Sequence, residues 1–217
     1  MCIRDRHLAP PGPEEDRLIE IGRHWIRKGH KVTVILPADG MNLNLKGKNI
    51  GLTEKECLVL VALNAPGMSQ DNQRERIKGN RKFARLLNSQ GKMLPEPGLV
   101  LAVAPPLSTA LAAEELSRSL KVPLVLEMRA GVDEEEAERG FIAGLFARSR
   151  LKKEENLLAS VLAVVADGKA AAAKVSGLLP EEAKNKVNVI AGQESGEELK
   201  ALYDCLLPVE EINKEKM

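Results

Sequence analysis

Aromatic side chains are scarce in this sequence: they make up 2% of its 217 residues, so any core must be built from aliphatic side chains. Its three cysteines, Cys2, Cys57 and Cys205, lie far apart and form no C-x-x-C pair, which argues against a disulfide framework and a zinc site. No apolar run approaches the ~20 residues that a membrane-spanning helix needs. Residues 1–6 contain no apolar stretch, so they do not form a signal peptide. The sequence therefore predicts a cytoplasmic protein with reduced thiols and no bound metal.

The sequence lacks an excess of charge of either sign: it has 32 basic and 31 acidic residues, which leave a net charge of +1. This balance gives no general reason to expect nucleic acid as a partner. Six basic residues nevertheless gather between positions 74 and 85, in a predicted amphipathic helix. They form either a solvated helix face or a surface for peripheral contact with the inner face of an anionic membrane.

Five short aliphatic runs predict the strands of the fold. They occupy residues 32–36 (VTVIL), 58–63 (LVLVAL), 99–103 (LVLAV), 124–126 (LVL) and 161–166 (VLAVVA), and a weaker sixth lies at 187–190 (VNVI). The runs are continuous rather than alternating, as in strands that are buried on both faces of a parallel sheet. We predict that the runs at 32–36, 99–103, 124–126 and 161–166 are mutually parallel.

Helical patterns separate these runs. The first starts near residue 14 and is closed by Gly29, a residue suited to the left-handed backbone that ends many helices. Further helices are predicted at residues 77–90, 107–120, 133–156, 169–178 and 196–206, and loops at residues 38–55 and 64–73. Strands and helices in alternation predict an α/β fold with a doubly wound parallel sheet.

The first strand of such a fold is missing or degenerate in this sequence. Residues 2–6 offer one aliphatic side chain, Ile3, and three charged ones. Burying an unpaired charge in a central strand would cost several kcal/mol. We therefore expect either a gap or a thin strand of two or three residues between the runs at 32–36 and 99–103.

Three segments, taken in order, resemble the family-four GT-B glycosyltransferases. RLIEIGRHWIRKGHKVTVILP (residues 17–37) resembles their first helix and second strand. VLAVAPPLSTALAAEELSRSLKVPLVLEMR (residues 100–129) resembles their strand–PP–helix–strand segment. LLASVLAVVADGKAAAAKVSGLLPEEAKNKVNVIAG (residues 157–192) resembles the elements that precede their hinge. The resemblance spans residues 10–192 and is strongest to the subgroup that glycosylates lipid-linked or cell-wall acceptors.

The resemblance implies a single Rossmann-like GT-B half, the half that holds the sugar acceptor. We place this domain at residues 10–207, between a non-native or disordered leader (1–9) and a tail (208–217). MCIRDR also resembles a translated sequencing-adapter remnant, which would mean that the native first strand was cut off. The resemblance implies no cofactor, and a nucleotide-sugar would be bound only with a second domain.

Position and resemblance together select seven substrate-binding candidates: Gly12, Pro105, Pro106, Ser108, Thr109, Glu127 and Arg129. In open α/β sheets, ligands bind beyond the carboxyl ends of the strands. The turn at 104–109 is either a substrate contact that uses two hydroxyls or an ordinary turn with Ser108 as the helix N-cap. The family pattern is broken beside these candidates, by acidic residues after Gly12 and by Ala130-Gly131-Val132 after Arg129.

Glu127 and Arg129 are two residues apart in a predicted strand and so point to the same face of the sheet. They form either a charge pair in a cleft, which would bind a sugar hydroxyl and a phosphate or carboxylate, or a surface ion pair of little value. His24 is expected to be exposed. The acidic residues 133–136 are expected to form a charged first helical turn rather than a metal site.

Two classes of function follow. The first is an acceptor-side glycosyltransferase domain, inactive alone, from an enzyme that moves a sugar from a nucleotide-sugar to a lipid- or glycan-linked acceptor. The second is a non-catalytic Rossmann-like subunit or the partner of a separate donor-binding chain. A third, an unrelated flavodoxin-like protein, would need a phosphate-binding loop that the sequence does not show. No catalytic residue is assigned.

Overall fold

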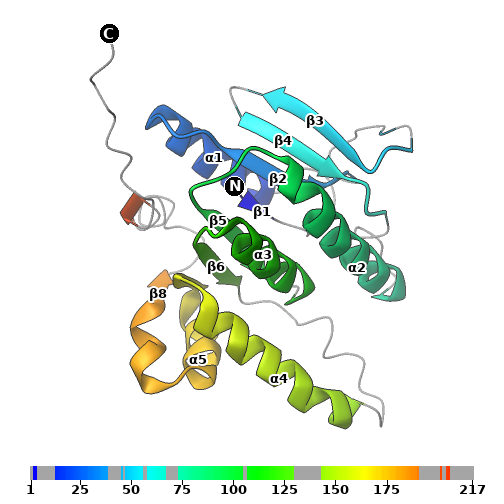
Figure 1. Cartoon of the computed structure of the whole chain (residues 1–217). Helices are drawn as coiled ribbons and strands as arrows, with labels where there is room; N and C mark the ends of the chain where they lie inside the picture. The colour runs from blue at the N-terminus through cyan, green and yellow to red at the C-terminus, as the bar shows by residue number, and fades with distance from the viewer. Residues whose placement is uncertain are drawn as a thin grey trace.

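An eight-stranded sheet flanked by helices forms the fold (Figure 1). The computed structural model describes residues 2–3, 13–38, 45, 47–55, 58–66, 73–104, 107–129, 143–190, 201 and 204–205. Within these residues the sheet has eight strands. The predicted helix at 196–206 lies largely outside them, and so do the acidic residues 133–136 and the tail at 208–217.

The strands are β1 (Cys2–Ile3), β2 (Thr33–Pro37), β3 (Ile50–Lys55), β4 (Leu58–Leu63), β5 (Val100–Ala104), β6 (Leu124–Arg129), β7 (Ala163–Asp167) and β8 (Val187–Ile190). The helices are α1 (Pro13–Arg27), α2 (Gln73–Gln90), α3 (Leu107–Leu120), α4 (Ala143–Ser160) and α5 (Gly168–Leu178). Two short 3-10 helices, Gly91–Met93 and Glu181–Lys186, follow α2 and precede β8.

The strand order across the sheet is β3-β4-β2-β1-β5-β6-β7-β8. All neighbouring strands are parallel except β3, which pairs antiparallel with β4 at one edge. The four runs predicted to be mutually parallel form β2, β5, β6 and β7, so that prediction is confirmed. The fold is α/β and Rossmann-like, as the continuous aliphatic runs indicate.

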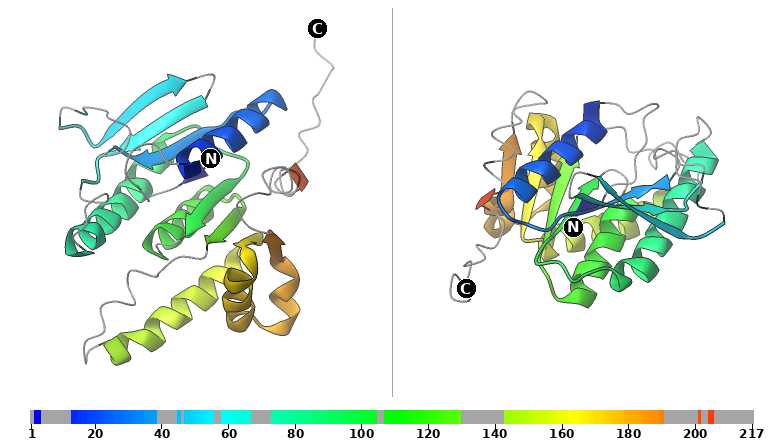
Figure 2. Two further views of the ribbon diagram at one scale, coloured as in Figure 1. Left: turned by 180° about the vertical axis from the view of Figure 1, so that it is seen from behind. Right: turned by 90° about the horizontal axis from the view of Figure 1, so that it is seen from above.

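Helices cover both faces of the sheet. Alternate strand residues point to opposite faces, and the buried side chains accordingly fall into two main clusters. One cluster joins the sheet to α2, α3, α4 and α5 through residues such as Phe83, Leu116 and Leu158. The other joins the opposite face to α1 through Ile21 and Trp25. Figure 2, seen from above, shows α1 on the other side of the strands from α2 and α3.

β1 is as thin as the sequence predicts. Its two residues lie between β2 and β5 and pair with both: Cys2 aligns with Val34 and Leu101, and Ile3 aligns with Ile35 and Ala102. The predicted thin strand is therefore present at the centre of the sheet. Residues 4–12 lie outside the described part of the chain.

The end of α1 also follows the sequence prediction. Gly29 has φ +91°, and its N–H donates to the carbonyl of Ile26 at 2.9 Å. The N–H of His30 donates to the carbonyl of Trp25 at 3.0 Å. This pair of hydrogen bonds satisfies the last carbonyls of the helix and turns the chain into β2.

The prediction of a loop over residues 38–55 is wrong in its second half, because residues 50–55 form β3. The loop was predicted because residues 38–55 are rich in glycine and asparagine. The segment IGLTEK is an edge strand with little burial: Ile50 packs against the core, whereas Leu52 is 62% exposed and Glu54 is exposed. Helix bounds also shift: α2 begins at Gln73 rather than 77, and α4 ends at Ser160 rather than 156, while residues 133–142 of the predicted helix lie outside the described residues.

Within the part of the chain that the structure describes, no helix is both long and apolar enough to cross a membrane.

Candidate functional site

The candidate site is the edge of the sheet where the parallel strands end. β1 connects through α1 to β2 on one side, whereas the chain returns after β4 to β5 on the other side of β1. The strand order therefore reverses between β1 and β5, and in doubly wound sheets ligands bind in the crevice at such a point. The first turn of α3 and the last residues of β6 lie at this edge.

Glu127 and Arg129 are brought together at the end of β6. Arg129 Nε donates to Glu127 Oε1 at 2.8 Å, with side-chain exposures of 10% and 0%. The interpretation as a surface ion pair is therefore wrong, because both side chains are largely removed from water. The carboxylate of Glu127 accepts this hydrogen bond and so restricts the position of the guanidinium, while the predicted substrate-binding roles of both residues remain predictions.

Ser108 and Thr109 lie in the first turn of α3. The helix begins at Leu107, so the prediction of Ser108 as the N-cap residue is wrong. Thr109 is fully buried. Ser108 Oγ is also buried, and it has no hydrogen-bond partner in the described structure. An unsatisfied buried hydroxyl is costly, and this one lies at the edge where ligands are expected.

The sheet separates these two pairs of residues. Glu127 and Arg129 alternate with Leu126 and Met128, which face the α3 side. The ion pair therefore faces the α1 side, whereas Ser108 and Thr109 belong to a helix on the opposite face. Both pairs are at the carboxyl edge, but the structure does not place them in one cluster.

Gly12, Pro105 and Pro106 lie outside the described residues, and their predicted roles remain predictions. In sequence they follow β1 and β5, the two strands that flank the reversal point. Among the described residues, no group of three or more histidine, cysteine, aspartate or glutamate side chains is placed to bind a metal ion.

His24 is not the exposed residue that the sequence predicted. Its Nε2 lies 3.1 Å from Asp204 Oδ2, 180 residues away in the chain, and Lys28 Nζ also donates to this carboxylate. Partial burial alone would raise the pKa of Asp204, but the hydrogen bonds and charges of Lys28 and His24 outweigh it and lower the pKa below its ordinary value of 3.8. The contact ties the C-terminal segment to α1.

No protein-family model matches the chain, and no curated protein matches it in sequence. Solved structures do resemble it. The apo structure of OtsA matches with a TM-score of 0.51 at 10% identity, over 82% of this chain and 42% of that one. A structure described as "Trehalose-6-phosphate from E. coli bound with UDP-2-fluoro glucose" matches with the same TM-score and identity, over 82% and 41%.

This fold is one Rossmann-like half of the GT-B architecture. At 10% identity the likeness shows the fold alone, and it does not single out family four. The chain spans about two fifths of the length of the structures that it resembles.

Removing Arg129 should destabilise the protein strongly. Arg129→Ala leaves the carboxylate of Glu127 buried without this partner, so we expect the free energy of unfolding to fall by about 3 kcal/mol at pH 7. The double variant Glu127→Leu with Arg129→Met should recover most of that loss. Urea denaturation measures both. Arg118→Ala, at an exposed pair with Glu114, is the control and should cost about 0.5 kcal/mol; an equal loss at both arginines would contradict the buried pair.

The contact of Asp204 should be lost in acid. Because its pKa is lower in the folded protein, its contribution is present above about pH 4 and disappears as the pH falls through the lowered value. Asp204→Asn should therefore lower the melting temperature at pH 6, and the difference from the unaltered protein should shrink as the pH falls through the lowered pKa. Glu181→Gln, at an exposed pair with Lys184, serves as the control. A difference for Asp204→Asn that persists in acid would rule out this linkage.

Proposed function

We propose that this chain is the acceptor-side half of a GT-B glycosyltransferase of the family-four type. The whole enzyme would move a sugar from a nucleotide-sugar to a lipid- or glycan-linked acceptor on the cytoplasmic side of a membrane. The fold supports the proposal, since the chain has one Rossmann-like half of this architecture. The three ordered segments that resemble family four support the finer assignment.

The observation that carries the proposal is the placement of Arg129. A guanidinium binds carboxylate and phosphate groups through a planar fork of N–H donors, and its strength depends on how firmly it is held. The fully buried carboxylate of Glu127 fixes this guanidinium at the carboxyl edge of β6. We expect Arg129 to bind an anionic group of the acceptor and Glu127 to act as its positioning residue. The unsatisfied hydroxyl of Ser108 is consistent with a ligand at the same edge.

Sugar transfer would depend on a second domain. In GT-B enzymes the groups that stabilise the leaving diphosphate belong to the donor half. One structural neighbour is described with a bound UDP-sugar analogue, and that chain is more than twice as long as the matched part. The alternative is a non-catalytic subunit or the partner of a separate donor-binding chain. A reading frame that continues past residue 217, or a neighbouring gene for a donor domain, separates the two.

Purified alone, the chain should bind an acceptor without transferring sugar. Binding is measured calorimetrically against free oligosaccharides and their lipid-linked counterparts, and transfer by release of UDP from UDP-sugars. Arg129→Lys keeps the charge but loses the planar fork, so we expect it to weaken acceptor binding about tenfold. Arg118→Lys, on the exposed face of α3, is the matched control.

Two results would contradict this proposal. Turnover of any nucleotide-sugar by the chain alone would show that the donor groups are present in it. Acceptor binding that Arg129→Lys leaves unchanged would remove Arg129 from the site.

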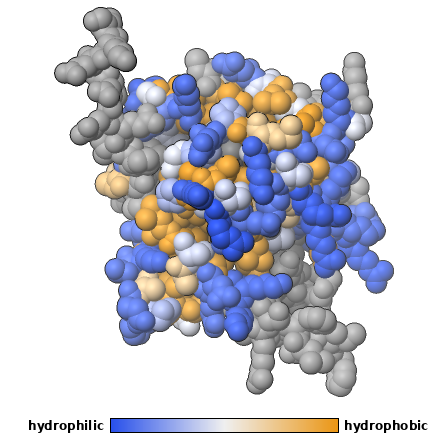
Figure 3. Space-filling model, in the orientation of Figure 1, coloured by the Kyte–Doolittle hydropathy of each residue, from blue (hydrophilic) through white to orange (hydrophobic). Residues whose placement is uncertain are grey.

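We also propose that α2 contacts an anionic membrane surface peripherally. The helix carries six basic residues and one acidic residue, which leaves 26 basic and 30 acidic residues, a net charge of −4, for the rest of the chain. Four of the basic residues form one exposed stripe at helical spacing: Arg74, Lys78, Arg81 and Arg85. Figure 3 shows hydrophilic side chains gathered on the side of the molecule where α2 lies. Met93, just beyond the helix, is 77% exposed.

Vesicle sedimentation tests this surface. The chain should bind vesicles of phosphatidylglycerol and not those of phosphatidylcholine, and binding should weaken with salt. Reversing two charges, Arg81→Glu with Arg85→Glu, should reduce binding at least about tenfold. Arg118→Glu with Lys121→Glu, two exposed residues of the α3 region, makes the same charge change elsewhere. Equal losses in both double variants would argue for overall charge rather than a surface on α2.

A further inference from the structure

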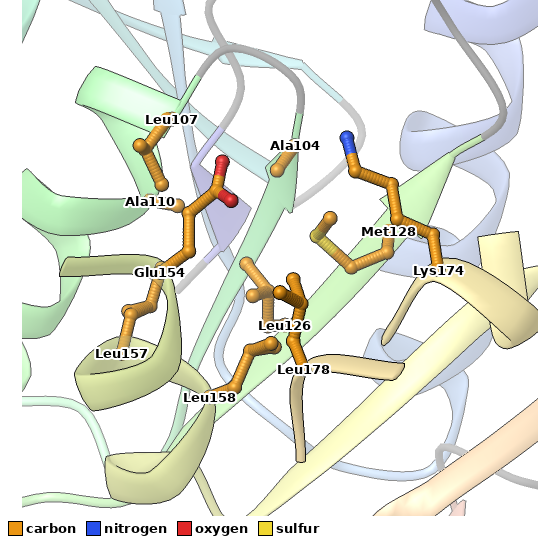
Figure 4. Close-up of a pocket in the computed structure, with 10 residues that line it drawn as sticks. All are labelled: Ala104, Leu107, Ala110, Leu126, Met128, Glu154, Leu157, Leu158, Lys174 and Leu178. Atoms are coloured by element: carbon orange, nitrogen blue, oxygen red, sulfur yellow. The ribbon is translucent and has the colours of Figure 1, made fainter. Parts of the chain in front are cut away.

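A small hollow lies where α3, α4 and α5 meet over the sheet (Figure 4). Its lining is mostly alanine, leucine and methionine, and its volume is about 20 Å³, which is room for one small group. At this size it is a packing gap in the core rather than a ligand site. The larger unpartnered feature of the described structure lies at an edge of the sheet.

That feature is the outer edge of β3. β3 is the first strand in the order of the sheet, and within the described residues only β4 pairs with it (Figure 1). Leu52, in the middle of β3, is 62% exposed, and Glu54 and the preceding Lys48 are exposed as well. An exposed edge strand offers unpaired N–H and C=O groups to any chain that can add a further strand.

The pairing with β4 shows which backbone groups point outward. The N–H of Asn64 donates to the carbonyl of Asn49 at 2.9 Å, which extends the β3–β4 ladder by one residue pair. In an antiparallel pair, the hydrogen-bonded positions alternate along each strand, so the odd-numbered residues bond to β4. The N–H and C=O groups of Ile50, Leu52 and Glu54 therefore point to the outer edge, where an added strand would bond to them.

We propose that a second copy of this chain adds its β3 to this edge, antiparallel and related by a two-fold axis at Gly51. In this register Ile50 of each copy lies opposite Leu52 of the other, and both are positions whose backbone groups point outward. Lys48 of each copy lies opposite Glu54 of the other, on the same face as the aliphatic pair. The inference goes beyond the proposed function and does not depend on it.

The side chains favour this register over its neighbours. Lys48 and Glu54 are roughly 20 Å apart along an extended strand, so they cannot pair within one copy. An axis moved to Leu52 sets Ile50 against Glu54, and an axis moved to Ile50 sets Leu52 against Lys48. Of the three registers, only the one through Gly51 pairs the aliphatic side chains with each other and the opposite charges with each other.

Pairing of β3 with itself closes at two copies. The same edge is used on both copies, so no β3 edge is left free to add a third. Pairing of β3 with β8, at the other end of the sheet, would be a contact between different edges and would allow an open fibre. β3 has six residues, so the interface is small and we expect a Kd in the micromolar range.

Sedimentation velocity on the full chain tests the proposal, at concentrations from about 5 to 500 µM. We expect an equilibrium between monomer and dimer without larger species. Leu52→Lys places a charge at the exposed edge and should weaken dimerisation at least about tenfold. Since Leu52 is exposed, the fold should be unaffected, which circular dichroism checks. Leu162→Lys makes the same change at a leucine that is 47% exposed before β7, and it should leave dimerisation unchanged.

A charge swap tests the register. Lys48→Glu sets an acidic side chain against Glu54 at both symmetric positions and should weaken dimerisation severalfold, and Glu54→Lys should do the same. The double variant, Lys48→Glu with Glu54→Lys, restores two pairs of opposite charge. Its Kd should return to near that of the unaltered chain.

Several results would overturn the inference. They are a chain that stays monomeric at every concentration, equal losses from Leu52→Lys and Leu162→Lys, a double charge variant that associates as weakly as the single variants, or growth into species larger than a dimer. None of these results bears on acceptor binding through Arg129, which is measured separately.

Discussion

The two halves of the sheet are joined by a strand of two residues. In the described structure β2 and β5 are not paired with each other, and the backbone of Cys2 and Ile3 bridges them. The reversal point of a doubly wound sheet lies beside this strand, so the position of the candidate site depends on it. The close packing of α2 against α3 supports the junction from one face, because α2 also contacts β4 on one side of β1 and α3 contacts β5 on the other side. The aliphatic side chains of β2 and β5 then bury both faces of the centre, which the short β1 could not do alone.

At the carboxyl edge of β6, the two faces of the sheet carry different kinds of side chain. Period-two alternation places Glu127 and Arg129 on the α1 side of the sheet, whereas Leu126 and Met128 face the α3 side. The last four residues of β6 therefore place an ion pair on one face of the sheet and apolar side chains on the other.

The sequence predicted what depends on local pattern. Continuous aliphatic runs located β2, β4, β5, β6, β7 and β8, and Gly29 located the end of α1, because burial on two faces and a left-handed backbone each restrict the residue types that fit. β3 was missed because none of residues 50–54 is fully buried at this edge of the sheet, so the segment carries no continuous aliphatic run. The contact of His24 with Asp204 joins positions 180 residues apart, and no local pattern records it. The shared face of Glu127 and Arg129 followed from strand periodicity, but their burial depends on packing from distant segments.

Burial changes what Glu127 and Arg129 can do. An exposed pair of this kind would be worth little and would be screened by salt. Here the carboxylate is fully buried and the guanidinium is 10% exposed, so each charge depends on a partner held at a fixed distance of 2.8 Å. The strand supplies that distance, because residues i and i+2 stand side by side on one face. A guanidinium fixed in this way would lose little conformational freedom on binding the anionic group proposed for the acceptor, which is a reason beyond stability for such a pair at the carboxyl edge of the sheet.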